Sequence, residues 1–163
     1  MSLKYGCITP NVKGRTYPVA ASQYFAHEGA NFVYLDSSGH VTLALTATAT
    51  LFGWVDAPIG VGAGAAGSVY WKSSATAGAD KIFVVTDKNA EFLVPGNITA
   101  TAAMLGGAWD LLSINDGTVG TVDLDTSTTD VLIATELGVN VAKDAVAAAV
   151  VVTINEAKRQ SDT

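Results

Sequence analysis

Residues 41–51 alternate between apolar and polar side chains, and this pattern constrains the fold more than any other feature of the sequence. Every odd position is apolar, and threonine fills most of the even positions between them. Successive side chains of a β-strand point to opposite faces, so alternation of period two indicates a strand with one buried face. Threonine also favours strands because its branched Cβ fits a pleated surface. We therefore predict a long strand over 41–51, with Leu45 on its buried face and shorter strands gathered around it.

Turn residues divide the rest of the chain into short strands. The run NFVYL at 31–35, followed by the turn residues Asp36 to Gly39, predicts a β-hairpin with the long strand. Gly53 is expected at a bulge or corner, because a glycine within a strand marks such sites. A second hairpin is predicted from KIFVVT at 81–86 and a returning strand at 91–94. Further strands are predicted at these positions: 68–73, 109–114, 119–124, 131–134 and 150–154.

About nine short strands with little helix predict an all-β fold, a compact antiparallel β-barrel or sandwich of jelly-roll-like form. One short helix is expected at 99–105, with Asn97 as its cap, and residues 136–147 fit a helix or a loop with a short strand. Residues 1–22 carry Pro10, Gly14 and Pro18, which predicts an extended N-terminal arm; such an arm either packs on a neighbour or frays. The predicted domain covers 23–155, and 156–163 form a charged tail.

Composition narrows the function classes. Hydrophobic residues make up 49% of the chain and charged residues only 15%, below the roughly 25% of typical soluble domains, which excludes disorder over most of the length. Either much of the surface is buried against partners, or this is a plain globular domain with a neutral exterior. The net charge is −6, with no basic cluster beyond Lys158-Arg159, which argues against direct nucleic-acid binding.

Targeting and redox signals are few. The N-terminus has no apolar core of a signal peptide. The longest near-apolar run, 55–70, is rich in glycine and contains Asp56 and Pro58, so we expect a loop and no membrane span. The single cysteine, Cys7, cannot form an intrachain disulfide. The expectation is a soluble protein made without export.

Two motifs look like known sites but lack residues that those sites require. The run GVGAGAAG, Gly60 to Gly67, has neither the Lys-Ser/Thr ending nor the following helix of a phosphate-binding loop. We interpret it as a plain loop. His27-Glu28 begins like a zinc-protease motif, but position 31 is asparagine and His40, the other histidine, lies in a predicted turn. A surface histidine is the preferred interpretation.

Acidic and nucleophilic residues give no firm site either. Asp123, Asp125, Ser127 and Asp130 are spaced as alternate oxygen ligands for Ca²⁺, but the glycine and closing glutamate of the helix–loop–helix calcium site are missing. A polar loop is the preferred interpretation. No G-x-S-x-G motif is present, Cys7 has no obvious base, and carboxylate pairs that converge in space remain open. We therefore predict no catalytic, cofactor-binding or metal residue, no cofactor, and no enzymatic activity.

The aromatic residues lie mainly on predicted strands, where core packing explains most of them. A lectin-like binding platform would instead expose one or two rings. The seven aromatic residues on predicted strands are these: Phe52, Trp54, Tyr70, Trp71, Phe83, Phe92 and Trp109.

The run KIFVVTDKNAEFLVPGNITATAAMLGGAWDLLSINDGTVGTVDLDTSTTDVLIATELGV, with AAVVVTIN after it, resembles small β-rich structural proteins of tailed bacteriophages, in particular capsid decoration (cement) proteins and related head proteins. The resemblance covers residues 31–155 and rests on strand order and on the turns L-G-G-x-W-D-L and N-D-G. It implies a virion structural protein, made in the host cytoplasm and placed on the outer capsid surface. It also implies a homotrimer that clamps neighbouring major capsid subunits, with residues 1–22 reaching over a neighbour, and no contact with nucleic acid or membrane.

An alternative function is a non-catalytic binding module of a phage particle, such as a carbohydrate-binding β-sandwich. This alternative predicts that Trp54 or Trp71 is exposed and contacts a glycan.

Overall fold

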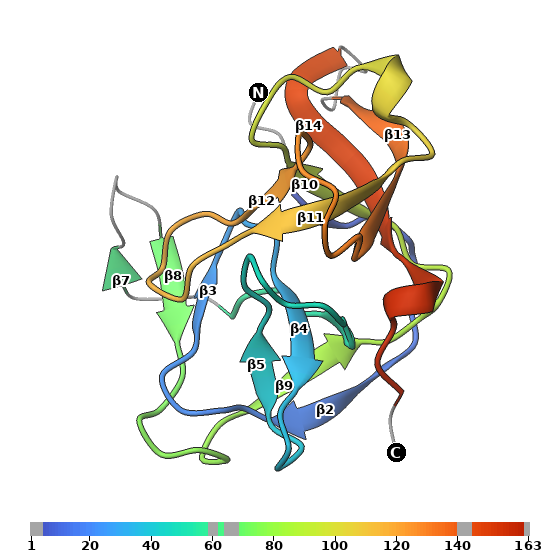
Figure 1. Ribbon diagram of the computed structural model, residues 1–163. Coiled ribbons are helices and arrows are strands. Elements are labelled where there is room, and N and C mark those ends of the chain that lie inside the picture. The colour runs from blue at the N-terminus through green and yellow to red at the C-terminus, as the bar shows by residue number, and fades with distance from the viewer. Residues whose placement is uncertain (1–4, 59–61, 64–68, 140–144, 162–163) are drawn as a thin grey trace.

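The computed structural model describes residues 5–58, 62–63, 69–139 and 145–161. These residues form three antiparallel sheets, two short 3₁₀ helices and no α-helix (Figure 1). The all-β prediction is therefore confirmed. In Figure 1 a curled sheet lies above a five-stranded sheet, and a small third sheet lies at one side.

The largest sheet has six strands and curls on itself. Its strands, in spatial order, are β1 (Gly6–Cys7), β10 (Phe92–Pro95), β14 (Ala145–Ile154), β13 (Leu132–Val139), β11 (Ala108–Leu112) and β12 (Thr121–Asp123). Just after β10 the chain returns to β12, since Gly96 bridges Val122 and the Asn97 N–H donates to the Val122 carbonyl at 3.0 Å. The described strands nevertheless form no closed barrel.

Two smaller sheets complete the fold. The five-stranded sheet contains, in order, β2 (Gly14–Pro18), β9 (Lys81–Val85), β6 (Gly53–Trp54), β4 (Phe32–Leu35) and β5 (Val41–Leu43). The three-stranded sheet contains β3 (Tyr24–Ala26), β8 (Val69–Lys72) and β7 (Gly62–Ala63). The 3₁₀ helices cover Ala102–Met104 and Glu156–Lys158.

The five-stranded sheet is the middle layer of the protein, because residues from both of its faces enter apolar clusters. Phe32 and Val85 face the larger apolar cluster under the curled sheet, whereas their chain neighbours Val33 and Val84 face a second cluster. A strand buried on both faces shows apolar runs instead of alternation. The run NFVYL fits this description at Phe32 and Val33, and KIFVVT fits it only at Val84 and Val85, since Phe83 is exposed.

Three aromatic rings join the middle layer to the curled sheet. Trp54 is only 2% exposed, and its ring centroid lies 4.9 Å from that of Phe32 and 5.0 Å from that of Phe92. Each such side chain buries a large apolar area, and edge-on or offset ring pairs add about 0.5–1.5 kcal/mol. The indole N–H is also bonded, to an Asp56 carboxylate oxygen at 2.9 Å. Its burial and its ring contacts make Trp54 a core residue, and the bond to Asp56 satisfies its polar group.

The prediction of a long strand over 41–51 is wrong beyond Leu43. Residues 44–50 form a loop, and Leu45 is 37% exposed. Two threonines explain the difference, because the hydroxyl of Thr48 bonds within the loop and that of Thr46 bonds to the main chain of Ser113. The Thr48 hydroxyl accepts from the Leu45 N–H at 2.8 Å, the Thr48 N–H returns to the Leu45 carbonyl, and Thr46 bonds to Ser113.

Of the two predicted hairpins, one is confirmed and one is wrong. Strands β4 and β5 pair antiparallel around a turn in which the Asp36 carboxylate accepts from the N–H groups of Ser38 and His40. Strands β9 and β10 do not pair: β9 pairs with β2 and β6, and β10 with β1 and β14. The turn at 87–89 therefore connects two layers instead of two neighbouring strands.

The segment 1–22 is extended over 14–18, as predicted, but its hydrogen-bond partners lie in the same chain. Strand β2 pairs with all five residues of β9, and β1 pairs with β10. Val19 is fully buried in the second apolar cluster. These contacts make the described part of the segment an integral part of the sheets.

Three further expectations need correction. The predicted helix at 99–105 is a single 3₁₀ turn whose N-cap position is Thr101, and Asn97 instead binds Asp123, Asp125 and the Leu124 N–H. Of the two alternatives for 136–147, the helix is wrong for the described residues, because 136–139 lie in β13 and 145–147 in β14; residues 140–144 lie outside the described residues. Gly53 lies in strand β6 rather than at a bulge or corner. Glycine is needed there because a Cβ would collide with the Val85 carbonyl of β9. The Gly60 to Gly67 run lies outside the described residues, except for Gly62–Ala63 in β7.

Candidate functional site

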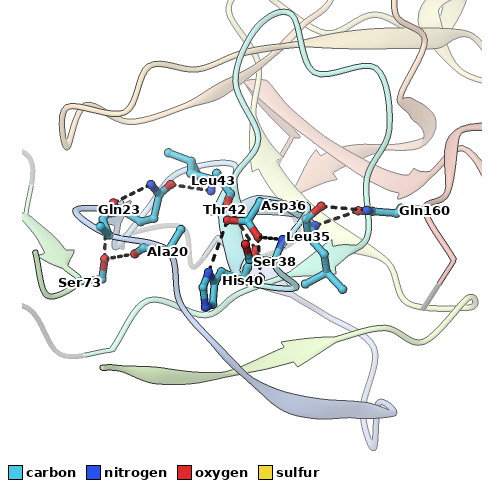
Figure 2. A network of polar contacts seen from close by, with 11 residues as sticks. Ala20, Gln23, Leu35, Asp36, Ser38, His40, Thr42, Leu43, Ser73 and Gln160 are labelled. Carbon is cyan, nitrogen blue, oxygen red and sulfur yellow. Dashed lines mark hydrogen bonds and ion pairs between the residues drawn. The ribbon is translucent and has the colours of Figure 1, made fainter. Parts of the chain in front are cut away.

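The polar side chains around Gln23 serve the fold. The Gln23 side-chain oxygen accepts from the Leu43 N–H at 2.9 Å, and its main-chain N–H donates to the Ser73 hydroxyl at 2.8 Å (Figure 2). The Ser73 hydroxyl in turn donates to the Ala20 carbonyl at 2.8 Å. Buried polar groups need such partners. These contacts tie β3, β5 and β8 together, and the groups are already satisfied within the protein.

The C-terminal segment is also fixed to the domain. The Gln160 side-chain amide donates to the Leu35 carbonyl at 2.9 Å and accepts from the Leu35 N–H at 2.8 Å (Figure 2). On the main chain, the Leu51 N–H donates to Lys158 and the Gln160 N–H donates back to Leu51. The described part of the predicted charged tail, residues 156–161, is therefore part of the folded surface.

A groove of about 580 Å³ lies where this C-terminal segment passes the start of β2. Figure 1 shows the red C-terminal segment descending beside that strand. Four parts of the chain meet there: β2, the residue before β6, the turn after β9, and the C-terminal 3₁₀ helix with the residues that follow it up to Ser161. The side chains that matter for its chemistry are Arg15, Tyr17, Phe52, Lys88, Glu156 and Arg159.

The floor of the groove is apolar and aromatic. Arg15 and Tyr17 are two residues apart on β2, so both point to the same side of the strand. The Tyr17 ring meets the buried Phe52 ring edge-on, with centroids 5.2 Å apart and an interplanar angle of 89°. The aromatic pair gives the groove an apolar base under a charged rim.

The rim of the groove is positively charged. The Glu156 carboxylate lies between two cations, 2.9 Å from Arg159 Nε and 3.3 Å from Lys88 Nζ. The hydrogen bond from Arg159 lowers the pKa of Glu156, and Lys88 acts in the same direction. The ion pairs of the described residues do not include Arg15. Among the side chains that line the groove, three cations against one carboxylate leave two positive charges in excess, in a chain whose net charge is −6.

A second cavity, of about 390 Å³, brings together Cys7, His27 and Asp56. The sequence alone suggested no base near Cys7, and the structure places a histidine and a carboxylate in the same cavity. The thiol is nevertheless not activated, because burial raises the pKa of Cys7, and the group points to the Thr9 carbonyl. A nucleophilic cysteine requires the opposite shift. The cavity therefore does not resemble a thiol active site.

The aspartates of the predicted polar loop separate into two hydrogen-bonded groups. Asn97 donates to Asp123 and Asp125 at 2.9 and 3.2 Å, and Ser127 donates to Asp130 at 2.5 Å. Burial raises the pKa of Asp123, and the side-chain interaction with Asp123 lowers the pKa of Asp125. No cluster of three or more His, Cys, Asp or Glu side chains suited to a metal occurs among the described residues.

Asp110 organises this loop. Its buried carboxylate accepts from the main-chain N–H groups of Thr128, Thr129 and Asp130 at 2.8–3.0 Å. Burial alone would raise the pKa of Asp110, but the three N–H donors outweigh it, and the pKa lies below the ordinary 3.8. The ionised form is thus the form that the fold stabilises.

Replacing Asp110 with asparagine should lower the unfolding free energy at pH 7 by about 2 kcal/mol, since the charged acceptor of three partly buried N–H bonds is lost. Because the folded-state pKa lies below 3.8, the carboxylate contributes fully above that pH. Its contribution is lost as the pH falls through the folded-state pKa. Urea denaturation from pH 7 to pH 2 should therefore show the two proteins converging only in acid.

The exposed Asp116, whose carboxylate bonds to Thr118 in its own turn, provides the control, and D116N should have a smaller effect. A constant gap between D110N and the parent protein down to pH 2 would contradict this assignment.

The two tryptophans expected on a glycan platform are engaged elsewhere. Trp54 lies in the core, and the half-buried Trp71 stacks on Phe25 with centroids 5.9 Å apart. Among the strand aromatics, Phe83 is the exposed one, at 49%, and it lies over Gly14. Neither Trp54 nor Trp71 therefore forms the flat, open surface that the alternative function predicts.

The sequence indicated only one element of the groove, the pair Lys158-Arg159. Arg15, Lys88 and Arg159 are spread over most of the chain, and the pairing of β2 with β9 brings the first two together. Comparison of the chain with protein-family models, with curated proteins and with solved structures finds no match. Among the described residues no helix is long and apolar enough to cross a membrane.

Proposed function

We propose that this chain is a virion structural protein that decorates and stabilises the capsid of a tailed bacteriophage by clamping neighbouring major capsid subunits. The observation that carries the proposal is a set of exposed aliphatic side chains around the connection between β11 and β12. Ile114 is 62% exposed, and Leu112 and Val119 are exposed near it in the chain. Single exposed apolar side chains are common, whereas apolar side chains gathered at one place on a surface mark contact sites for other proteins.

These side chains stand on a rigid base. The Asn115 side chain accepts from the Tyr24 N–H at 2.8 Å and donates to the Ser22 carbonyl at 3.2 Å. Gly117 packs against the Tyr70 ring, where a Cβ would collide with it. A contact surface that is ordered before binding loses little conformational entropy on association. This geometry supports a role in assembly.

Weak individual contacts suffice for such a role if the protein is a homotrimer. A trimer that engages several capsid subunits gains affinity through effective concentration. A low-charge surface also suits burial between subunits, because the centres of interfaces are depleted in charged residues. The second argument agrees with the 15% content of charged residues.

The test is co-sedimentation with capsid shells of the phage that encodes this chain, purified without the decoration protein. We expect the parent protein to sediment with the shells and the double variant Leu112→Ser/Ile114→Ser to remain in the supernatant. The matched control is Ile8→Ser, an exposed aliphatic residue next to β1, which should bind normally. Circular dichroism and light scattering establish folding and the native mass of each variant. Failure of the parent protein to bind the shells would overturn the proposal.

A further inference from the structure

The groove between β2 and the C-terminal segment combines features that seldom occur together on an acidic protein. Its rim carries Arg15, Lys88 and Arg159, and its floor is the Tyr17–Phe52 pair. The carboxylate of Asp87 accepts from the main-chain N–H groups of Lys13 and Asn89, and it also interacts electrostatically with Arg159, which contributes to lowering the pKa of Asp87. With Glu156, two carboxylates therefore face three cations, and one positive charge remains in excess. An excess of positive charge therefore faces outward over an apolar base.

The groove is built before any ligand arrives. The Arg159 side chain is only 11% exposed and is held by Glu156. The bonds of Gln160 to Leu35 and Leu51 hold the C-terminal segment beside the groove in place. Because these groups are already ordered, a ligand would bind without the entropic cost of assembling the site.

Strand β2 favours an extended ligand over a compact one. It is an edge strand, the first in the order β2-β9-β6-β4-β5. The bonds Thr86 N–H to Lys13 carbonyl and Val19 N–H to Asp80 carbonyl direct the odd residues toward β9. By alternation, the main-chain groups of Gly14 and Thr16 face outward. Exposed strand edges bind extended peptides by main-chain pairing.

The charges also favour a peptide over other anions. A compact anion such as phosphate placed between Lys88 and Arg159 would meet the Glu156 carboxylate that already occupies that position. Nucleic acid would meet a chain with a net charge of −6, whereas backbone binding needs a continuous basic surface. An acidic peptide can reach Arg15 and Lys88 on the rim while an apolar side chain rests on Tyr17.

We propose that this groove recognises an extended, acidic segment of a partner protein that carries at least one apolar side chain. The ligand's carboxylates pair with Arg15 and Lys88, and its apolar side chain covers the Tyr17–Phe52 floor. The recognition goes beyond the clamping role and does not depend on it. The residues involved differ from Leu112 and Ile114, so the two proposals fail separately.

The experiment measures the fluorescence anisotropy of a labelled glutamate-rich peptide with a central leucine as the full chain is added. We expect saturable binding that weakens as salt rises, because the rim pairs are exposed. The same peptide with glutamine in place of glutamate should bind at least about tenfold more weakly, a difference of about 1.4 kcal/mol. Inorganic phosphate and duplex DNA should not compete.

The matched variants change the net charge equally at different places. The double variant Arg15→Glu/Lys88→Glu should weaken peptide binding by about tenfold or more. The control Lys72→Glu/Lys81→Glu alters two exposed cations outside the groove, and its affinity should remain within about twofold of the parent protein, the small change expected of long-range charge at moderate salt. Absence of peptide binding, equal weakening in both variants, or competition by phosphate or DNA would each overturn the proposal. Circular dichroism confirms folding of both variants.

Discussion

Replacing Leu43 with aspartate is expected to prevent the chain from folding, whereas the same change at Leu45 leaves it folded. Leu43 ends strand β5 and is buried in the cluster beneath the five-stranded sheet. Losing a buried leucine costs about 2–5 kcal/mol, and an uncompensated buried charge adds about 3–5 kcal/mol. Their sum reaches the total stability of a typical domain, about 5–15 kcal/mol.

Leu45 is the matched control because it lies two positions along the same alternating pattern. It is exposed on the loop after β5, so an aspartate there keeps its hydration. Far-ultraviolet circular dichroism and urea denaturation of both variants test the pair directly. An unfolded L45D protein would restore the long strand over 41–51, and a fully folded L43D protein would contradict the position of β5 in the core.

The contrast between these two leucines shows what local patterns predict well. Strands were predicted correctly at 31–35, 81–86, 91–94 and 109–114, where β-branched and aromatic residues are bounded by turn residues. The stretch 44–50 has the same alternation but forms a loop. The hydroxyl of Thr48 bonds within the loop and that of Thr46 bonds to the distant Ser113, and this competition of side-chain bonds with sheet pairing is not visible in the pattern.

Strand pairing was harder to predict than strand position. Consecutive strands pair more often than not, which made a hairpin of 81–94 the natural expectation. The structure instead places β9 in the middle layer and β10 in the curled sheet. One partner of each strand, β2 for β9 and β1 for β10, comes from the N-terminal segment, where Gly14 and Pro18 gave no strand signal. Glycine and proline are tolerated there because β2 is an edge strand.

The groove could not be predicted for the same reason. Its cations come from β2, from the turn after β9 and from the C-terminal segment, and only the pairing of β2 with β9 and the docking of Gln160 bring them together. The sequence alone shows an acidic chain without a basic cluster beyond Lys158-Arg159. Folding concentrates a few of its cations on one side of one edge strand.

Deleting residues 1–22 is expected to destabilise the whole domain severely. The deletion removes β2, which pairs with all five residues of β9, and β1, which pairs with β10. Burial of Val19 alone stabilises the fold by about 1.5–3 kcal/mol, and each lost main-chain hydrogen bond removes about 1 kcal/mol more. The truncated protein should unfold at much lower urea concentration, or fail to fold.

A shorter deletion of residues 1–12 provides the graded comparison. It removes the two-residue strand β1 but leaves β2 and Val19 in place, so its loss of stability should be clearly smaller than that of the longer deletion. Urea denaturation followed by tryptophan fluorescence measures both, since Trp54 lies in the core between the two larger sheets. If the longer deletion left the unfolding free energy unchanged, residues 1–22 would be a separable arm, and the capsid-clamping role of an arm would regain its support. A large loss instead assigns the segment to the folded domain, and leaves the groove beside β2 and the exposed β11–β12 side chains as the two proposed surfaces for partners.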